Sequence, residues 1–436
     1  MSQPTPTPAP TQPKIVHRLV VRTLVLILIL GVCVKGYQWW LDKSGDITNL
    51  KPAQTFSWIA AVQYQQDGQQ AIAISPDGKI TPAPGWKTGK TDRDVTWNPS
   101  GNRIFFVTDR EENNFHVFRW NPTDGTDPVQ KSFGTRSHSL PMFTRQDIEG
   151  ADDSALITSG GFVLEYVPKN MSTLQLLPPT GKEVSTASED EGGGQSDQFS
   201  GAYSKLGNSF KSAQWCKGRE WIAAIMRRDE GEVLILQYMH QDNEGKFPPP
   251  HLVAAGEHVE IDVNPADGTV IFAVQNFQWP SEEMIPSQFR KGNKVTRPFS
   301  HYLGKIDPGD GAGELPPVVP LAMSKDDKIC FGSPTISPDG ASVAFIGGPY
   351  KDGALESAAL ATAPIVPGGI QSKAVLATGK IHEPSWSPNG DLLVFAQDMP
   401  SGHRSLIEIH KDGSGSRNLT GDAGNYGDPV FSPQKQ

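Results

Sequence analysis

A short unit that the chain repeats several times constrains its fold more than any other feature. Its clearest copy, EPSWSPNGDLLVFAQ at Glu383–Gln397, has a β-rich run that ends on Trp386, a turn at Ser387–Gly390 and an apolar run at Leu392–Phe395. In the turn, Pro388 presets φ, the asparagine bonds back to the backbone, and the glycine adopts φ values that other residues avoid. The unit therefore predicts a strand, a tight turn and a second strand.

The spacing of the copies predicts how these strands assemble. Each copy is marked by the large apolar residue two positions before the turn proline or its substitute. The markers are Trp97, Phe143, Trp215, Val263, Ile336, Trp386 and Phe431. Successive markers lie 46, 72, 48, 73, 50 and 45 residues apart. Short strands that recur about every 40–50 residues are typical of β-propeller blades, and an inserted surface loop explains each longer interval. The sequence predicts an all-β propeller.

These repeats resemble the PD40, or WD40-like, repeats of the TolB-type β-propeller family, whose motif has the form P-x-W-S-P-D-G before an apolar strand. Good matches are SPTISPDGASVAFIGG at Ser333–Gly348 and DVTWNPSGNRIFFVT at Asp94–Thr108. The resemblance runs from about Trp58 to Phe431. It implies the fold but no single function, because such repeats occur in partner-binding scaffolds, peptidase gating domains and a few lyases.

The ends of the repeat array predict a closed ring. Three strands precede the first full copy, at 57–65, 70–75 and 79–83, and a truncated copy, Asp428–Phe431, comes last. Together they would make one four-stranded blade, which removes the exposed edges that a linear array leaves. The count is then seven blades, with six as the alternative if Leu140–Thr158 is an irregular insertion.

The region before the propeller carries the membrane signal. Arg22 belongs to a basic flank, Leu24 and Leu28 belong to the apolar core, and Trp39 and Trp40 would lie in the interfacial belt. A retained anchor is favoured over a cleaved signal peptide, with a lipoprotein as the third alternative. The basic flank predicts a cytoplasmic tail and an extracytoplasmic propeller in the periplasm or at the cell surface. The predicted divisions are a disordered Pro/Thr-rich tail at 1–18, the transmembrane or signal anchor at 19–40, a polar tether at 41–56 and the propeller at 57–436.

Two insertions interrupt the propeller. The segment at about 178–208 is acidic and rich in Gly and Ser, whereas the segment at about 277–299 is basic and aromatic. If consecutive strands alternate in direction, both insertions lie on the same face of the ring. The tether would enter on the other face, so the decorated face should point away from the membrane. The apolar Trp279 and Phe289, beside Arg290, indicate either a partner surface or packing within the loop.

Composition excludes some classes of function. A net charge of −9 without a basic stripe argues against a nucleic-acid partner. Outside the anchor the cysteines are Cys216 and Cys330, for which two buried thiols are favoured over a disulfide. The sequence has no G-x-S-x-G, H-E-x-x-H, P-loop or paired C-x-x-C motif. No catalytic residue, cofactor or metal is therefore predicted.

Three histidines supply the alternative to a non-catalytic protein. His138, His258 and His382 precede the markers of three alternate repeats by four or five residues, which predicts positions around the mouth of the axial funnel. Some lyases with TolB-like propellers gather histidines around a metal at this mouth, and the resemblance implies that possibility here. Alternate blades lie far apart, however, and metal–nitrogen bonds are only about 2.0–2.1 Å long. A polar rim that contacts a partner is the favoured interpretation.

The sequence thus predicts a membrane-anchored, extracytoplasmic propeller that binds a protein partner in the cell envelope and catalyses nothing. The alternatives are an enzyme of the polysaccharide-lyase type and a sensor that binds a glycan or small molecule in the funnel. The residues predicted to contact the partner are Trp279, Phe289, Arg290, His138, His258 and His382.

Overall fold

The computed structural model divides the chain into two compact units, 1–53 and 54–436. The residues that the structure describes all lie in the second unit: 57–111, 114–133, 137–143, 155–159, 162–167, 170–174, 209–244, 247–292, 294–311, 313–325, 329–351, 354–355, 358–367, 373–421 and 424–433. The predicted tail, anchor, tether and acidic insertion lie outside them. None of the helices in this described part is long and apolar enough to cross a membrane.

The described residues form antiparallel sheets of mostly four strands. The first sheet has the order β3-β2-β1-β31, with β1 (Ile59–Gln65), β2 (Gly68–Ile74), β3 (Ile80–Pro82) and β31 (Asn425–Phe431). The second comprises β4 (Asp92–Trp97), β5 (Ile104–Thr108), β6 (His116–Trp120) and β7 (Val129–Gln130). The third comprises β8 (Met142–Phe143), β9 (Ala155–Ser159), β10 (Phe162–Val167) and β11 (Asn170–Leu174). Leu140–Thr158 therefore supplies two paired strands.

A seven-stranded sheet follows in the middle of the chain. Its strands are β12 (Ser209–Cys216), β13 (Trp221–Arg228), β14 (Gly231–Tyr238), β15 (His251–Val263), β16 (Val270–Gln278), β19 (His301–Ile306) and β20 (Val319–Ser324). The long β15 joins two groups of strands, because its first half pairs with β14 and its second half with β16. It thus ends one group of four strands and begins the next.

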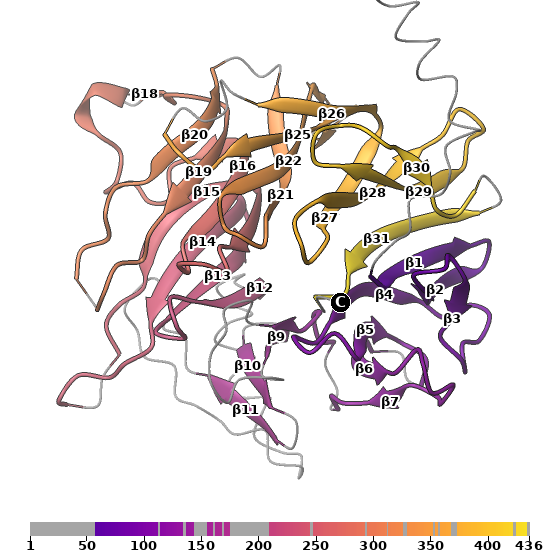
Figure 1. The fold of residues 1–436 in the computed structure, drawn as a ribbon. Coiled ribbons are helices and arrows are strands. Elements are labelled where there is room, and N and C mark those ends of the chain that lie inside the picture. The colour runs from indigo at the N-terminus through magenta and orange to yellow at the C-terminus, as the bar shows by residue number, and fades with distance from the viewer. Residues whose placement is uncertain are drawn as a thin grey trace, which may run out of the picture. The chain divides into compact units, whose positions relative to one another are not determined.

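Two more four-stranded sheets complete the fold. One comprises β21 (Cys330–Ile336), β22 (Ser342–Gly348), β25 (Ala358–Pro364) and β26 (Ala374–Gly379), and the other β27 (Ile381–Trp386), β28 (Leu392–Asp398), β29 (Arg404–His410) and β30 (Arg417–Asn418). Two small hairpins are β17 (Arg290–Lys291) with β18 (Lys294–Val295) and β23 (Tyr350–Lys351) with β24 (Ala354–Leu355). Figure 1 shows the sheets arranged around a centre near the C-terminus, which is the arrangement of a β-propeller.

The repeated turn folds as its sequence predicts. The Ser387 hydroxyl donates to Asn389 Oδ1 over 2.7 Å and accepts the Leu392 N–H over 2.9 Å. Gly390 has a φ of 72°, in the left-handed region that glycine adopts without strain. This copy therefore fixes its own hairpin through contacts within a few residues.

The pairing of the two ends of the propeller is confirmed. β31 pairs with β1, with Ile59 opposite Phe431 and Gln63 opposite Tyr426. Side chains of this sheet pack on both neighbouring sheets, so that Val62 lies in one core with Trp97 and Ile59 in another with Leu392. The last strand is therefore built into a sheet whose other strands come from the start of the propeller.

The marker tryptophans join neighbouring inner strands. Trp97 Nε1 donates to the Val430 carbonyl over 3.1 Å, and Trp386 Nε1 donates to the Thr335 carbonyl over 3.0 Å. Trp215 is equally buried, at 5 % exposure against 4 % for Trp97. Its Nε1, however, has no hydrogen-bond partner among the residues that the structure describes.

Trp97→Phe should therefore destabilise the protein more than Trp215→Phe. Both changes remove the same volume from a buried site. Only Trp97→Phe also removes a hydrogen bond, and it leaves the Val430 carbonyl without the indole donor. We expect a difference in the free energy of unfolding of about 1 kcal/mol, measured by urea denaturation of the two variants. Equal losses would show that the bond across the closure contributes nothing.

Cys216 and Cys330 are free and buried, which confirms the favoured interpretation of two thiols. Burial raises the pKa of the Cys330 thiol to about 11 and raises that of Cys216 as well. Neither thiol has the low pKa that makes a cysteine reactive.

Candidate functional site

The inner strands enclose a cavity of about 910 Å³ along the axis of the propeller. Its lining residues come from β4, β12, β15, β21, β27 and β31, and from β8 with the residues just before it. Aromatic side chains of the repeat markers, such as Trp97, Trp386 and Phe431, form part of the wall. Because all seven repeats contribute to it, the cavity is a product of the ring and of no single repeat.

Three carboxylates line one sector of this cavity. Asp94, Glu383 and Asp428 each lie three residues before a repeat marker, on β4, β27 and β31. β31 contacts both other strands, so the three residues lie on adjacent strands. All three have a positive φ, between 49° and 51°. The pairing register shifts at this position of β4 and β27, so a β-bulge turns the backbone there.

Hydrogen bonds connect the carboxylates to the backbone of the next inner strand. Glu383 Oε2 accepts the Asp428 N–H over 2.6 Å. Glu260, at the same repeat position on β15, accepts the N–H of Ser333 on β21. Asp94 has a longer contact, 3.6 Å from its Oδ2 to Arg93 Nε, and 48 % of its side chain is exposed. The Asp94 side chain is therefore only half buried, and it lines the cavity.

The pKa values of Asp94 and Asp428 are both raised in this sector. Burial raises the pKa of Asp428 to about 8, with further contributions from the charge and hydrogen bond of Glu383 and from Asp94. Burial also raises the pKa of Asp94, and Glu383 adds to that shift. The nearby Arg404 opposes the shift of Asp428, but its own Nε lies 2.7 Å from Asp398 Oδ1. This sector of the cavity therefore holds a carboxyl proton near neutral pH.

Asp428→Asn should remove a pH dependence of stability. The folded protein holds the Asp428 proton up to a pKa of about 8, against an ordinary value of 3.8. Between these values the folded state binds more protons than the unfolded state. The free energy of unfolding should then fall as the pH rises, by at most about 1.4 kcal/mol per pH unit. Asparagine also tolerates the left-handed backbone. Urea denaturation at pH 5 and pH 8 tests this.

The matched control for that measurement is Asp412→Asn, which removes an exposed carboxylate from a turn at the end of β29. It should keep the wild-type slope of stability against pH. If Asp428→Asn kept that slope too, the carboxylates would not be coupled as their positions indicate.

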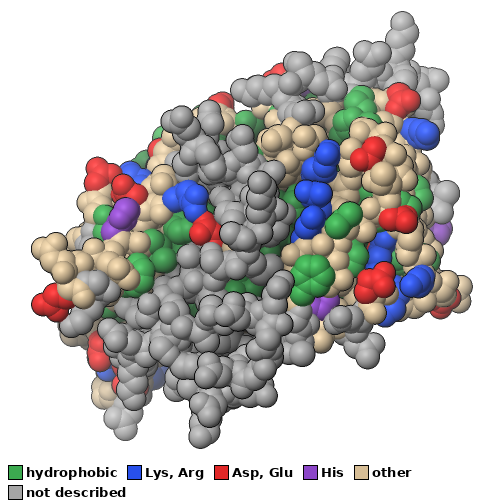
Figure 2. Space-filling view, turned by 90° about the horizontal axis from the view of Figure 1, so that it is seen from below, with side chains coloured by type: hydrophobic (Ala, Val, Ile, Leu, Met, Phe, Trp, Pro, Cys, Tyr) green, Lys and Arg blue, Asp and Glu red, His purple; other side chains and the backbone are tan. Residues whose placement is uncertain are grey.

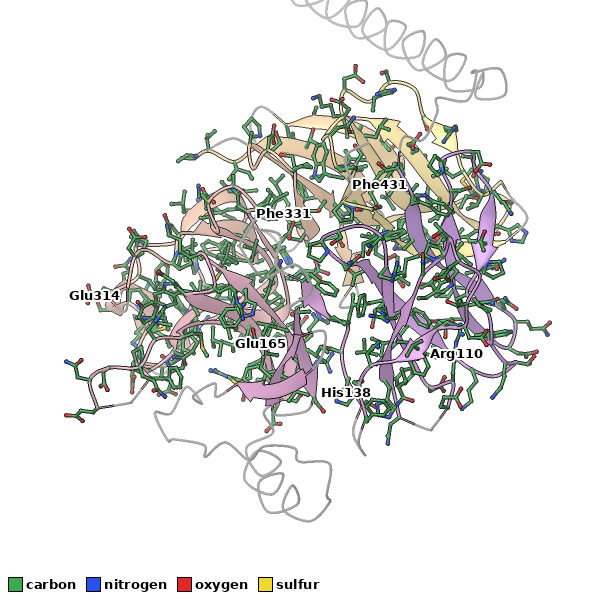
Figure 3. The ribbon with its side chains drawn as sticks, turned by 60° about the horizontal axis from the view of Figure 1, so that its bottom comes forward. Arg110, His138, Glu165, Glu314, Phe331 and Phe431 are labelled. Atoms are coloured by element: carbon green, nitrogen blue, oxygen red, sulfur yellow. The ribbon has the colours of Figure 1, made fainter. Side chains whose placement is uncertain are left out.

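The three predicted histidines are not among the residues that line the cavity. His138 is buried against His116 of β6, with ring centroids 5.4 Å apart. Burial lowers the pKa of His138 to about 4, and the charge of His116 adds to this shift. His258 is exposed on β15, and His382 Nε2 lies 3.5 Å from Asp398 Oδ1. In Figure 3, His138 also lies well apart from Phe431. Among the described residues, no group of three or more His, Cys, Asp and Glu could hold a metal ion.

The basic and aromatic insertion lies between β16 and β19. Trp279 packs against Phe277 and Phe289, with ring centroids 5.2 Å and 5.5 Å apart, and its Nε1 donates to the Thr296 carbonyl over 3.2 Å. Arg290 donates to backbone carbonyls of the same segment. The predicted partner residues Trp279, Phe289 and Arg290 thus hold the insertion together.

Other side chains of the insertion face the solvent. Met284 and Val295 are each 44 % exposed. Lys291 and Lys294 on the β17–β18 hairpin are exposed as well, and Figure 1 places β18 at the outer edge of the propeller. Elsewhere the surface mixes charges, as the described part of the face in Figure 2 shows. The insertion therefore combines a packed base with exposed apolar and basic groups.

Sequence reasoning missed the role of the acidic sector. None of Asp94, Glu383 and Asp428 is among the residues that the sequence predicts to form a site. The signal was present, because the position three residues before the marker is acidic in four of the repeats: Asp94, Glu260, Glu383 and Asp428. Aligning the repeats on their markers reveals it.

No protein-family model and no curated protein matches this sequence. Among solved structures it is similar to TolB from Acinetobacter baumannii, with a TM-score of 0.47 and 14% identity, covering 88% of this chain and 68% of that chain. It is also similar to an oligogalacturonate lyase in complex with manganese, with a TM-score of 0.48, 10% identity and coverage of 83% and 84%. Similarity this low carries no conclusion about activity.

Proposed function

We propose that this chain is a seven-bladed propeller that acts as a non-catalytic, protein-binding scaffold in the cell envelope. The seven blades follow if β15 is divided between two groups of four strands, since the remaining strands already form five four-stranded sheets. A closed ring of sheets is a rigid platform, and connections on such a platform are suited to recognition.

One observation carries the proposal: exposed apolar side chains on a segment that is itself well packed. Met284 and Val295 are exposed next to Lys291 and Lys294, while the Trp279 cluster fixes the base of the segment. Such a surface loses little conformational entropy on binding. Its basic groups favour a partner with an acidic surface.

The test is cross-linking in the native envelope. A photoreactive residue at Val295 should give a discrete protein adduct, and the same residue at Val375 should not. Val375 is a matched control because it is 53 % exposed, close to Val295, but lies on β26 of another sheet. Lys291→Glu with Lys294→Glu should weaken the adduct from position 295. Identical adducts from both positions, or none, would contradict the proposal.

The proposed scaffold is held at the membrane by residues 19–40, with the propeller outside the cytoplasm. The support is the sequence of that segment, an apolar core between Arg22 and the belt residues Trp39 and Trp40. Deleting residues 1–40 and supplying a cleavable signal peptide should release the propeller from the membrane fraction. A wild-type protein already found in the soluble fraction would favour the cleaved signal peptide.

A further inference from the structure

Apolar and basic side chains lie together on the outer strands of the second sheet. The patch consists of Arg119, Val129, Lys131 and Phe133, and we call it the β7 patch. Val129 is 49 % exposed and Phe133 is 65 % exposed. Arg119 of β6 lies directly opposite Val129 of β7 in the strand pair, so the two side chains share a face of the sheet.

The residues after β7 keep the alternation of a strand. The Lys131 N–H donates to the Val117 carbonyl over 2.7 Å, and the Ser132 hydroxyl accepts the Val117 N–H over 2.8 Å. Ser132 is fully buried. Because alternate residues of a strand share a face, Lys131 and Phe133 project on the same side as Val129, and Ser132 projects on the other.

The two cations of the β7 patch lack an acidic partner. Within the described part of the chain, neither Arg119 nor Lys131 takes part in an ion pair. Burial lowers the pKa of Lys131, and the positive charge of Arg119 adds to that shift. At physiological salt a charge acts over about 8 Å, so the net charge of −9 of the whole chain does not neutralise the patch. The patch therefore attracts an anionic surface.

An exposed aromatic ring beside cations suits the surface of a membrane. Apolar side chains enter the boundary between headgroups and acyl chains, and basic side chains are attracted to anionic headgroups. The tether predicted at 41–56 spans at most about 58 Å when fully extended. It leads into the sheet of β1, which contacts β4 of the sheet that carries the patch. The β7 patch is therefore within reach of the bilayer.

We propose that the β7 patch binds anionic lipids of the membrane to which the chain is anchored, with its apolar side chains at the acyl-chain boundary and its cations at the headgroups. The inference rests on the proposed anchor at residues 19–40, and it gives the proposed scaffold an orientation. Figure 1 shows β7 and β18 on opposite sides of the propeller. Contact at β7 turns the inserted segment away from the membrane, toward a partner.

A fluorophore at position 129 of the full-length protein tests the proposal. The label is attached to Val129→Cys in a Cys33→Ala background, because Cys216 and Cys330 are buried. The protein is reconstituted in vesicles of phosphatidylcholine, with or without the anionic phosphatidylglycerol. In the anionic vesicles alone, the emission should shift to shorter wavelength and acrylamide in the water should quench it less.

Substitutions in the β7 patch should reverse this response. Arg119→Gln and Lys131→Gln should each lower the ratio of bound to unbound patch about fivefold, since each removes one cation from the anionic surface. Phe133→Ser should abolish the shift, because the ring no longer enters the acyl-chain boundary. All three positions are at least partly exposed, so the variants should fold.

The matched control is the same label at Val375→Cys on β26, where the valine is 53 % exposed. It should give one spectrum in both kinds of vesicle. Lys291→Glu with Lys294→Glu should leave the shift at position 129 unchanged, although it weakens the partner adduct at position 295. The two measurements therefore separate this inference from the partner surface.

The same emission from position 129 in both kinds of vesicle would overturn the proposal. A discrete protein adduct from that position in the envelope, without a response to anionic lipid, would also overturn it and assign the β7 patch to an acidic protein. Full-length protein that does not float with the vesicles would disprove the anchor, and this inference with it.

Discussion

A chain that stops before Asn425 should no longer unfold in one cooperative transition. The truncation removes β31, and with it the buried Tyr426 and Phe431. It also uncovers Ile59 and Val62 of β1, which lie in the cores on either side of the closing sheet. Losing one buried aromatic side chain costs about 3–5 kcal/mol, and a whole domain is stable by only about 5–15 kcal/mol. The stability lost with β31 should therefore exceed the free energy of unfolding of the whole propeller.

Thermal unfolding followed by circular dichroism measures this loss. Because the truncated chain could fail to accumulate, a second variant tests the same pairing in an intact protein. Tyr64 lies opposite Asn425 in the β1–β31 pair, so Tyr64→Cys with Asn425→Cys should form a disulfide. The oxidised form should melt at a higher temperature than the reduced form, since the bond links the two ends of the propeller. A truncated monomer that melts like the wild type, or a pair of cysteines that cannot be oxidised, would disprove the closure.

Arg110→Met should lower the free energy of unfolding by about 3–5 kcal/mol, because it leaves a buried carboxylate without its partner. The Arg110 and Asp92 side chains are only 3 % and 0 % exposed. Arg110 Nε donates to Asp92 Oδ1 over 2.8 Å, and Asp92 Oδ2 also accepts the Ala71 N–H over 2.9 Å. The pair thus joins β4 to β2 of the closing sheet. Arg110 lies in the connection between β5 and β6, and Figure 3 labels it beside the violet ribbon of the N-terminal part of the propeller.

The matched control for this variant is Arg103→Met, in the exposed turn before β5, where Arg103 donates to the Asn102 carbonyl. Its effect should stay within about 0.5 kcal/mol. The double variant Arg110→Met with Asp92→Asn should lose less free energy of unfolding than the two single variants lose in sum, since no unpaired charge then remains buried. Urea denaturation of the four proteins provides the comparison. Additive losses would show that the two side chains do not stabilise each other.

Much of the fold could be predicted because the repeat is a local structure. The hydroxyl of Ser387, the asparagine and glycine of its turn and the strand from Leu392 onward contact one another within a few residues. The period of the markers predicted the sheets for the same reason. The double role of β15 could not be predicted, because it depends on how two neighbouring sheets pair with one strand.

The candidate sites were harder to predict than the fold. Trp279 and Phe289 were expected either to meet a partner or to pack locally, and only the structure shows their rings against each other. The three histidines were expected around the mouth of the funnel, but none of them lines the cavity. His138 packs against His116, and His382 lies beside Asp398. Residues at equivalent positions of alternate repeats are held apart by the repeats between them.

The sequence by itself determined the strands, their turns and the pairing of the last strand with the first three, since these follow from local turn chemistry and from a repeat that ends incomplete. Only the tertiary structure decided that Asp94 and Asp428 share a cavity with Glu383. These residues are far apart along the chain, and their carboxylates interact because the ring brings its first and last inner strands into contact. Charge repulsion depends on distance in space, which the sequence does not specify.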